Sequence, residues 1–116
     1  MSLFNALFKQ DPLQNKVLAI NENIEEVIPD HSSAKFNVIW YGDFETDPKK
    51  LVYCVRVQTD QEKYELMEDA QLIKKLRLIL EKYDYPQDAQ SFVKISFESQ
   101  ETVDRESGGS WDLHLK

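Results

Sequence analysis

The apolar residues of this chain change their spacing along the sequence, and that change limits the folds that the chain can adopt. In two long segments they recur every three or four positions, which is the repeat of one face of a helix. Elsewhere they follow a period of two, which is the repeat of a half-buried strand. The pattern predicts helices and strands within one domain, residues 1–116, because this length is close to the commonest domain size.

The first helix is predicted over residues 11–28. Asp11 is suited to cap it, and Pro12 suits its first position. Pro29 predicts its end, because proline breaks the helical hydrogen-bond ladder. Residues 1–10 contain the segment SLFNALF. We expect this segment to form an N-terminal flap over the core, and the alternative is that it is a docking peptide. The apolar face of the helix consists of Leu13, Val17, Ile20, Ile24, Val27 and Ile28.

A second helix is predicted over residues 68–83, and its outer face carries the main basic concentration of the chain. Leu78 lies among these basic residues, so we expect it to be exposed in a regular helix. The apolar face of this helix consists of Leu72, Ile73, Leu76, Ile79, Leu80 and Tyr83.

Two β-rich runs, residues 36–41 and 51–57, follow a period of two. The loop between them, residues 42–50, contains a glycine and a proline, so the three segments predict an antiparallel hairpin. KYEL, residues 63–66, is either a short third strand, which we favour, or the entrance to the second helix. The region 35–66 is therefore expected to form a hairpin or a meander.

The last part of the chain, residues 91–116, is predicted to form two strands. SFVKISFE (91–98) and SWDLHLK (110–116) both show the period of a strand with one wet face. Two adjacent glycines between them permit the positive φ angles of a tight reversal. We therefore expect the final residues to close the sheet and to bury Trp111 in the core.

Together these elements predict an α+β fold with the order α-β-β-(β)-α-β-β. Helices and strands bury their apolar faces by packing on one another in layers. We therefore expect a two-layer domain in which one antiparallel sheet is covered on one face by the two helices.

The charge of the chain favours some partners over others. The formal net charge is −7, which disfavours nucleic acid and membrane surfaces, because binding to either gains from basic residues. An acidic surface suits a basic protein partner, or it serves only to keep the protein soluble. The single cysteine excludes an internal disulfide framework, so we expect a cytoplasmic setting. No particular oligomeric state is predicted.

The sequence predicts no enzyme, no cofactor and no metal site. It lacks an HExxH motif, a cysteine pair and a glycine-rich phosphate loop. Cys54 lies in an apolar run and is expected to be buried and inert. Asp43, Glu45 and Asp47 have the spacing that opens a calcium loop, but the loop's required glycine is replaced by Pro48. We therefore expect a solvated hairpin loop there.

Acidic residues gather in the predicted last hairpin, and they form the candidate partner-binding site. If the two last strands pair, several of these carboxylates share one end of the sheet. They are either a solvated hairpin or an anionic patch that steers a basic partner. The candidate residues are Glu98, Glu101, Asp104, Glu106 and Asp112.

Roughly over residues 12–116 the chain resembles one group of small acidic bacterial immunity proteins. The resemblance lies in the helix ending EEVIP (25–29), the hairpin sequence FNVIWYGDF (36–44), the leucine-patterned second helix and the two last strands. It implies a cytoplasmic antitoxin that binds and neutralises a toxin, often a nuclease, and it implies no catalytic residues. Small acidic secretion chaperones are similar in element order.

Our main functional hypothesis is a non-enzymatic protein-binding module, and specifically an immunity protein or antitoxin. We hypothesise that its carboxylates occupy the partner's basic cleft in place of phosphate. A secretion-type chaperone or adaptor is the alternative, and it would bind an extended segment at a sheet edge or on apolar helix surfaces. A small enzyme of unrecognised type is the second alternative.

Overall fold

The computed structural model describes residues 12–116. The predicted flap over residues 1–10 and the capping role of Asp11 lie outside the described residues. None of the helices within residues 12–116 is long and apolar enough to cross a membrane.

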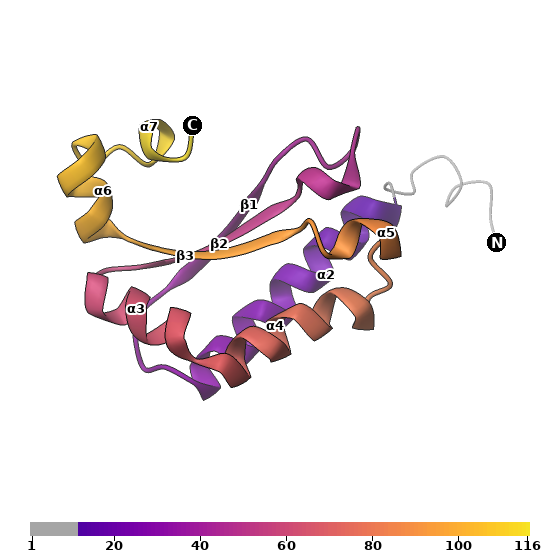
Figure 1. The fold of residues 1–116 in the computed structure, drawn as a ribbon, viewed down its shortest axis with the longest axis horizontal. Coiled ribbons are helices and arrows are strands. Elements are labelled where there is room, and N and C mark those ends of the chain that lie inside the picture. Colours follow the sequence, from indigo (N-terminus) through magenta and orange to yellow (C-terminus); the bar gives the residue numbers. More distant parts are fainter. Residues whose placement is uncertain (1–11) are drawn as a thin grey trace, which may run out of the picture.

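Helices and strands mix along the chain, as the change in spacing predicts, and the fold class is α+β (Figure 1). One short 3-10 turn, η1, follows the first helix, and another, η2, precedes the second strand. The elements, in order, are α2 (Pro12–Val27), η1 (Ile28–Asp30), β1 (Asn37–Tyr41), η2 (Pro48–Lys50), β2 (Val52–Val57), α3 (Asp60–Glu68), α4 (Ala70–Lys82), α5 (Gln87–Gln90), β3 (Lys94–Ser99), α6 (Gln100–Ser107) and α7 (Trp111–His114).

The sheet is mixed, so the prediction of an antiparallel sheet is wrong for its third strand. Its order is β1-β2-β3. β1 and β2 form the predicted antiparallel hairpin, with Trp40 opposite Tyr53. β3 runs parallel to β2, with Val55 beside Phe97. The reason is the connection: α3, α4 and α5 carry the chain back along the sheet, which is how parallel neighbours are joined.

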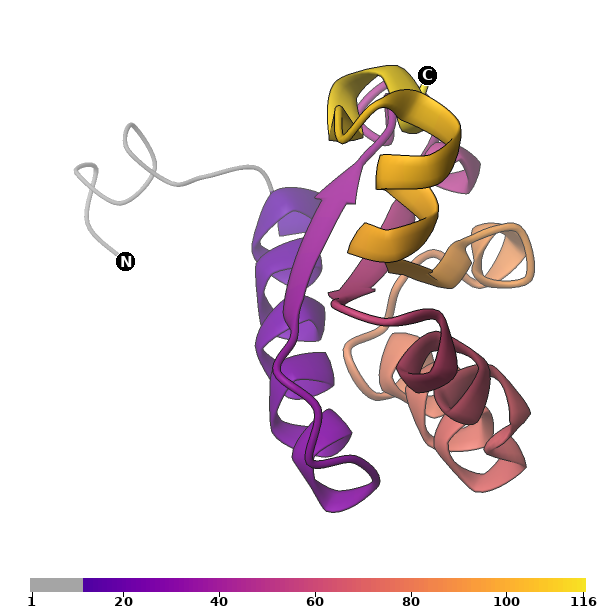
Figure 2. The ribbon, with the colours of Figure 1, turned by 90° about the vertical axis from the view of Figure 1, so that its left-hand side faces the viewer.

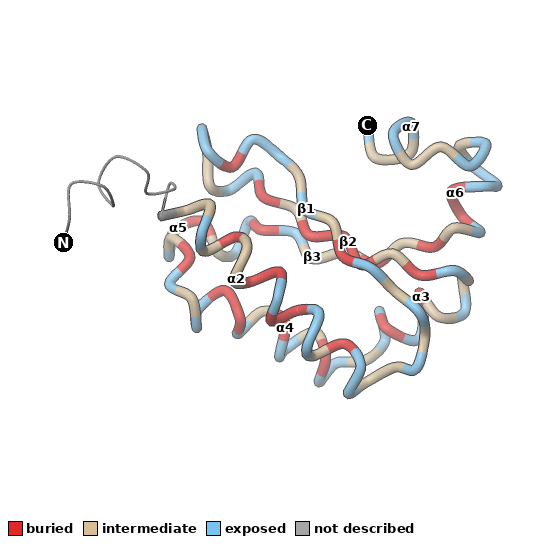
Figure 3. The backbone as a smooth tube through the Cα atoms, turned by 180° about the vertical axis from the view of Figure 1, so that it is seen from behind, coloured by how far each residue is buried: buried red, intermediate tan, exposed pale blue. Residues whose placement is uncertain are grey.

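The two long helices, α2 and α4, lie side by side on one face of the sheet (Figures 1 and 2). The two-layer prediction therefore holds for this part of the molecule only, because α6 and α7 lie beyond the strand ends. The Tyr53 hydroxyl donates a hydrogen bond of 2.6 Å to the carbonyl oxygen of Val17, which ties the sheet to α2. Buried residues gather where these helices face the strands (Figure 3).

The predicted third strand at residues 63–66 does not form. The segment lies in α3, a helix of its own that leads into α4, so the structure is nearer to the alternative, the entrance to the second helix, than to a strand. Thr59 and Glu62 form a capping box at the start of α3, in which each side chain accepts from the other residue's backbone N–H. α4 then starts after Asp69, whose carboxylate accepts from the N–H of Leu72 at 3.0 Å. Leu78 is exposed, as expected.

The predicted closing strand at residues 110–116 does not form. Gly108, with φ +59°, ends α6 as a left-handed cap, and Ser110 caps the short helix α7. The glycine pair therefore ends a helix and does not make a hairpin. Trp111 is half-buried and lies outside the core.

Candidate functional site: the carboxyl-terminal lobe

The chain ends in a small helical lobe, which we define as residues 100–114 and which contains α6 and α7. It lies beyond the carboxyl end of β3, apart from the layer of α2 and α4 (Figures 1 and 2). Ser99, the last residue of β3, also caps α6 through its hydroxyl, which accepts from the N–H of Thr102 at 3.1 Å. The lobe therefore begins without a connecting loop.

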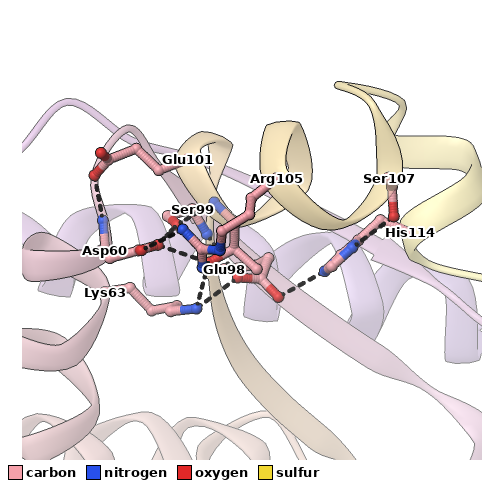
Figure 4. Close-up of polar contacts among 9 residues, drawn as sticks. Asp60, Lys63, Glu98, Ser99, Glu101, Arg105, Ser107 and His114 are labelled. Atoms are coloured by element: carbon pink, nitrogen blue, oxygen red, sulfur yellow. Dashed lines mark hydrogen bonds and ion pairs between the residues drawn. The ribbon is translucent and has the colours of Figure 1, made fainter.

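Asp60, at the start of α3, anchors the lobe. Its carboxylate accepts hydrogen bonds from the hydroxyls of Ser99 and Thr102, the latter at 2.6 Å (Figure 4). Arg105 donates to its other oxygen at 3.0 Å. The two hydroxyl bonds, supported by Arg105, lower the pKa of Asp60 to about 2. The carboxylate is therefore charged at neutral pH and fixed in position.

Glu98 and Lys63 form a second anchor beside the first. The Lys63 ammonium donates to a Glu98 oxygen at 2.9 Å and to the Thr102 hydroxyl at 2.8 Å. Burial raises the pKa of Glu98, but hydrogen bonds from His114, Lys63 and the N–H of Ser99 outweigh burial and lower it. Burial lowers the pKa of Lys63, and Glu98 outweighs that effect and raises it. Both groups therefore remain charged.

Ser107, His114 and Glu98 form a hydrogen-bonded row that has the residue types of a hydrolase triad. The Ser107 hydroxyl lies 3.0 Å from Nδ1 of His114, and Nε2 of His114 lies 2.8 Å from Glu98 (Figure 4). A neutral ring with its proton on Nε2 satisfies both contacts, because it donates to Glu98 and accepts from Ser107.

The surroundings of this row favour a structural role over catalysis. Acyl transfer needs backbone N–H groups that are free to hold an oxyanion. Here the N–H groups of Gly108 and Gly109 both donate to the carbonyl of Val103, and that of Ser110 donates to the carbonyl of Ser107. The N–H groups that follow Ser107 are therefore used within the fold, and the row holds α7 against β3.

Trp111 links α7 both to α6 and to strand β2. Its indole N–H donates to the side chain of Gln100 at 2.8 Å, and the Arg56 guanidinium lies 5.0 Å from the ring centre. A cavity of about 180 Å³ adjoins these residues, and neither Ser107 nor His114 lines it. Its lining residues are Lys35, Phe36, Asn37, Arg56, Val57, Gln58 and Trp111.

The five predicted partner-binding residues fall into two groups. Glu98 lies inside the anchoring network and is bonded to Lys63 and His114. The other four carboxylates lie at exposed positions of the lobe, although Glu101 also accepts from the N–H of Asp60 at 2.8 Å, and Asp104 accepts from Gln100. These four, which we call the lobe carboxylates, are Glu101, Asp104, Glu106 and Asp112.

The anchoring network itself was not predicted from the sequence. Asp60 and Lys63 lie in the region 35–66, which was predicted to form a hairpin or a meander. Thr102 lies between the two predicted last strands, and His114 lies in the second of them. Two local signals mark helix starts here: Ser99 precedes a polar segment, and Thr59 and Glu62 have the spacing of a capping box. Within residues 12–116, no group of three or more histidine, cysteine, aspartate or glutamate side chains could hold a metal ion.

Comparison with protein-family models, with characterised proteins and with solved structures finds no match to this chain. Its function is therefore inferred from its own residues.

Proposed function

We propose that this chain is a non-enzymatic protein-binding module whose carboxyl-terminal lobe recognises a protein with a basic surface. The observation that supports the proposal is the exposure of the lobe carboxylates on helices that the Asp60 and Glu98 networks hold in place. Within the lobe, only Arg105 carries an opposing charge, and it is bonded to Asp60. A fixed anionic surface speeds the approach of a cationic partner and costs little ordering on binding.

The proposed partner class is a toxin of the nuclease type, so the chain would act as an immunity protein or antitoxin in the cytoplasm. A nuclease cleft is basic because it binds phosphate. Carboxylates on a rigid lobe can occupy such a cleft in place of the phosphates and exclude the nucleic acid. Arg105 and Lys63 would keep their ion pairs with Asp60 and Glu98 and would not contact the partner.

The test compares two variants that carry the same net charge. In the lobe variant the four lobe carboxylates are replaced by their amides, which preserves the acceptor oxygens that bond Asp60 and Gln100. In the matched control, four exposed glutamates outside the lobe become glutamine: Glu22, Glu26, Glu45 and Glu68. A partner is captured from a lysate of the source cells, identified by mass spectrometry and purified. Calorimetry then gives its affinity for each protein at about 50 mM and about 300 mM salt.

The proposal predicts that the lobe variant binds the purified partner about ten-fold or more weakly, whereas the control variant loses much less. Wild-type affinity should fall with salt, and that fall should be smaller for the lobe variant. Equal losses in the two variants would show that only total charge matters. An affinity that does not change with salt would remove the electrostatic mechanism.

A further inference from the structure

The guanidinium of Arg56 is held in place, although most of its hydrogen-bond donors are unused. Its Nε donates to the side-chain oxygen of Asn37 at 2.8 Å, and the two residues lie opposite each other in β2 and β1. The guanidinium also lies 5.0 Å from the ring centre of Trp111. Both neighbours are uncharged, so they fix the position of Arg56 without neutralising its charge.

The other two arginines of the chain use their terminal nitrogens within the fold. Arg77 donates from both of them to backbone carbonyls, and Arg105 donates to the carboxylate of Asp60. The terminal nitrogens of Arg56 have no hydrogen-bond partner among residues 12–116. Arginine carries donors in a planar fork, so Arg56 presents a fixed, charged and unoccupied fork to a ligand.

The cavity beside Trp111 has the lining of a site for a small organic anion. Its volume is about 180 Å³, and a cavity of about 150 Å³ can hold a benzene molecule, so a group of that size fits. Arg56 and the exposed Lys35 supply positive charge, and no acidic residue of the described chain lines the cavity. Phe36 and Trp111 supply aromatic surface. A few polar groups set in apolar surface are typical of ligand sites.

A carboxylate suits this cavity better than a phosphate. Phosphate sites commonly use backbone N–H groups at a helix start. Here the N–H of Asp60 donates to the Glu101 carboxylate at 2.8 Å, and the N–H of Glu101 donates to the carbonyl of Gln58 at 3.2 Å. The fork of one arginine matches the two oxygens of one carboxylate. A singly charged ligand is also repelled less than a doubly charged one by a chain of net charge −7.

We propose that this cavity binds a small aromatic carboxylate. The carboxylate accepts hydrogen bonds from the terminal nitrogens of Arg56, and Lys35 provides a second positive charge. The ring packs against Trp111 and Phe36. Trp111 belongs to α7, so the bound ligand also joins the lobe to the sheet. The site does not depend on the function proposed for the lobe.

The probe is sodium benzoate, titrated into ¹⁵N-labelled protein while sodium chloride keeps the ionic strength constant. The side-chain N–H signals of Arg56 and Trp111 in NMR spectra should shift together and saturate, with a Kd of about 1 mM or below. Benzamide has nearly the same shape without the charge, and it should bind about ten-fold more weakly or worse. Inorganic phosphate should also bind more weakly than benzoate.

Three variants test the roles of the two cations, with the Trp111 signal as the readout. Arg56→Gln should weaken benzoate binding about ten-fold or more, and Arg56→Lys should restore only part of the loss because it lacks the fork. Lys35→Gln, at an exposed position before β1, should weaken binding about two- to five-fold without disturbing the fold. The matched control is Lys74→Gln, which removes the same charge from an exposed position of α4 and should bind like the wild type.

The lobe variant should bind benzoate at least as tightly as the wild type, because it lacks four negative charges that repel an anion. That result is expected whether or not the lobe recognises a basic protein, so the two proposals can fail separately. Absence of a saturable shift up to about 20 mM benzoate would overturn this proposal. So would equal affinities of Arg56→Gln and Lys74→Gln for benzoate, or tighter binding of phosphate than of benzoate.

Discussion

Lys63 in α3 and Glu98 in β3 form an ion pair with 2.9 Å between Nζ and Oε1, and their side chains are only 10% and 20% exposed. The pair joins the start of the connection that leaves β2 to the strand in which that connection ends. The same carboxylate bonds His114 at 2.8 Å, so it also supports α7. One ion pair thus couples the crossover helix, the sheet and the lobe.

Replacing Lys63 with methionine should lower the free energy of unfolding by about 2–3 kcal/mol, because it leaves a largely buried carboxylate without its cation. Urea unfolding followed by far-UV circular dichroism measures the loss. The control is Lys74→Met, at an exposed position of α4, which should change stability by less than about 0.5 kcal/mol. Similar losses in the two variants would mean that the ion pair contributes nothing specific.

Acid should destabilise the protein through Asp60. Its pKa is about 2 in the folded protein, whereas an aspartate in an unfolded chain titrates near about 3.9. Between these values the unfolded state binds more protons, so stability rises with pH there and is lost as pH falls from about 5 to about 2. The free energy of unfolding, measured across this pH range, should depend less steeply on pH for Asp60→Asn than for the wild type. Asp43→Asn, at an exposed loop position, should retain the wild-type dependence.

Alkali should destabilise the protein through Tyr85, a buried tyrosine whose hydroxyl donates to the carbonyl of Pro48. Burial, with a smaller effect from Asp47, raises its pKa to about 12. An unfolded tyrosine ionises near about 10, so stability is lost as pH rises from about 10 to about 12, by at most about 1.4 kcal/mol per pH unit. Tyr85→Phe should be less stable at neutral pH and should lose less stability over that range. A wild-type slope in the variant would contradict this assignment.

The helices α2 and α4 and the hairpin of β1 and β2 could be predicted because each is long enough to show its period clearly. α2 keeps Val17, Ile20 and Ile24 on one buried face over four turns. The direction of β3 could not be predicted in this way. A strand has the same period in a parallel and an antiparallel pair, and only the path of α3, α4 and α5 decides between them.

The end of the chain was mispredicted because its segments are short. Alternation over a few residues does not distinguish a strand from one helical turn, and adjacent glycines serve a hairpin or a helix end equally well. Ser99 and Ser110 decide the outcome, since each accepts an N–H at a helix start.

The candidate site was predicted only in part, for a related reason. The sequence shows directly where acidic residues gather, and the four lobe carboxylates were selected for that reason. Lys63 and Glu98 are 35 positions apart, and His114 is 16 positions beyond Glu98. Tertiary folding alone brings these three side chains together, so no local pattern marks them.

In the hairpin loop the backbone of Lys50 passes close to Gly42, whose φ is +103°. A Cβ atom there would lie 2.0 Å from the carbonyl oxygen and 3.0 Å from the carbonyl carbon of Lys50. Both are backbone atoms, so an alanine requires the loop to move, in addition to the positive-φ cost of about 1–2 kcal/mol. Gly42→Ala should therefore lower the free energy of unfolding by about 3 kcal/mol or more. Gly108→Ala is the matched control, because Gly108 also has positive φ, +59°, but has nothing within 4 Å of an added Cβ. It should cost only about 1 kcal/mol, so equal losses in urea unfolding would show that the contact with Lys50 does not constrain the loop.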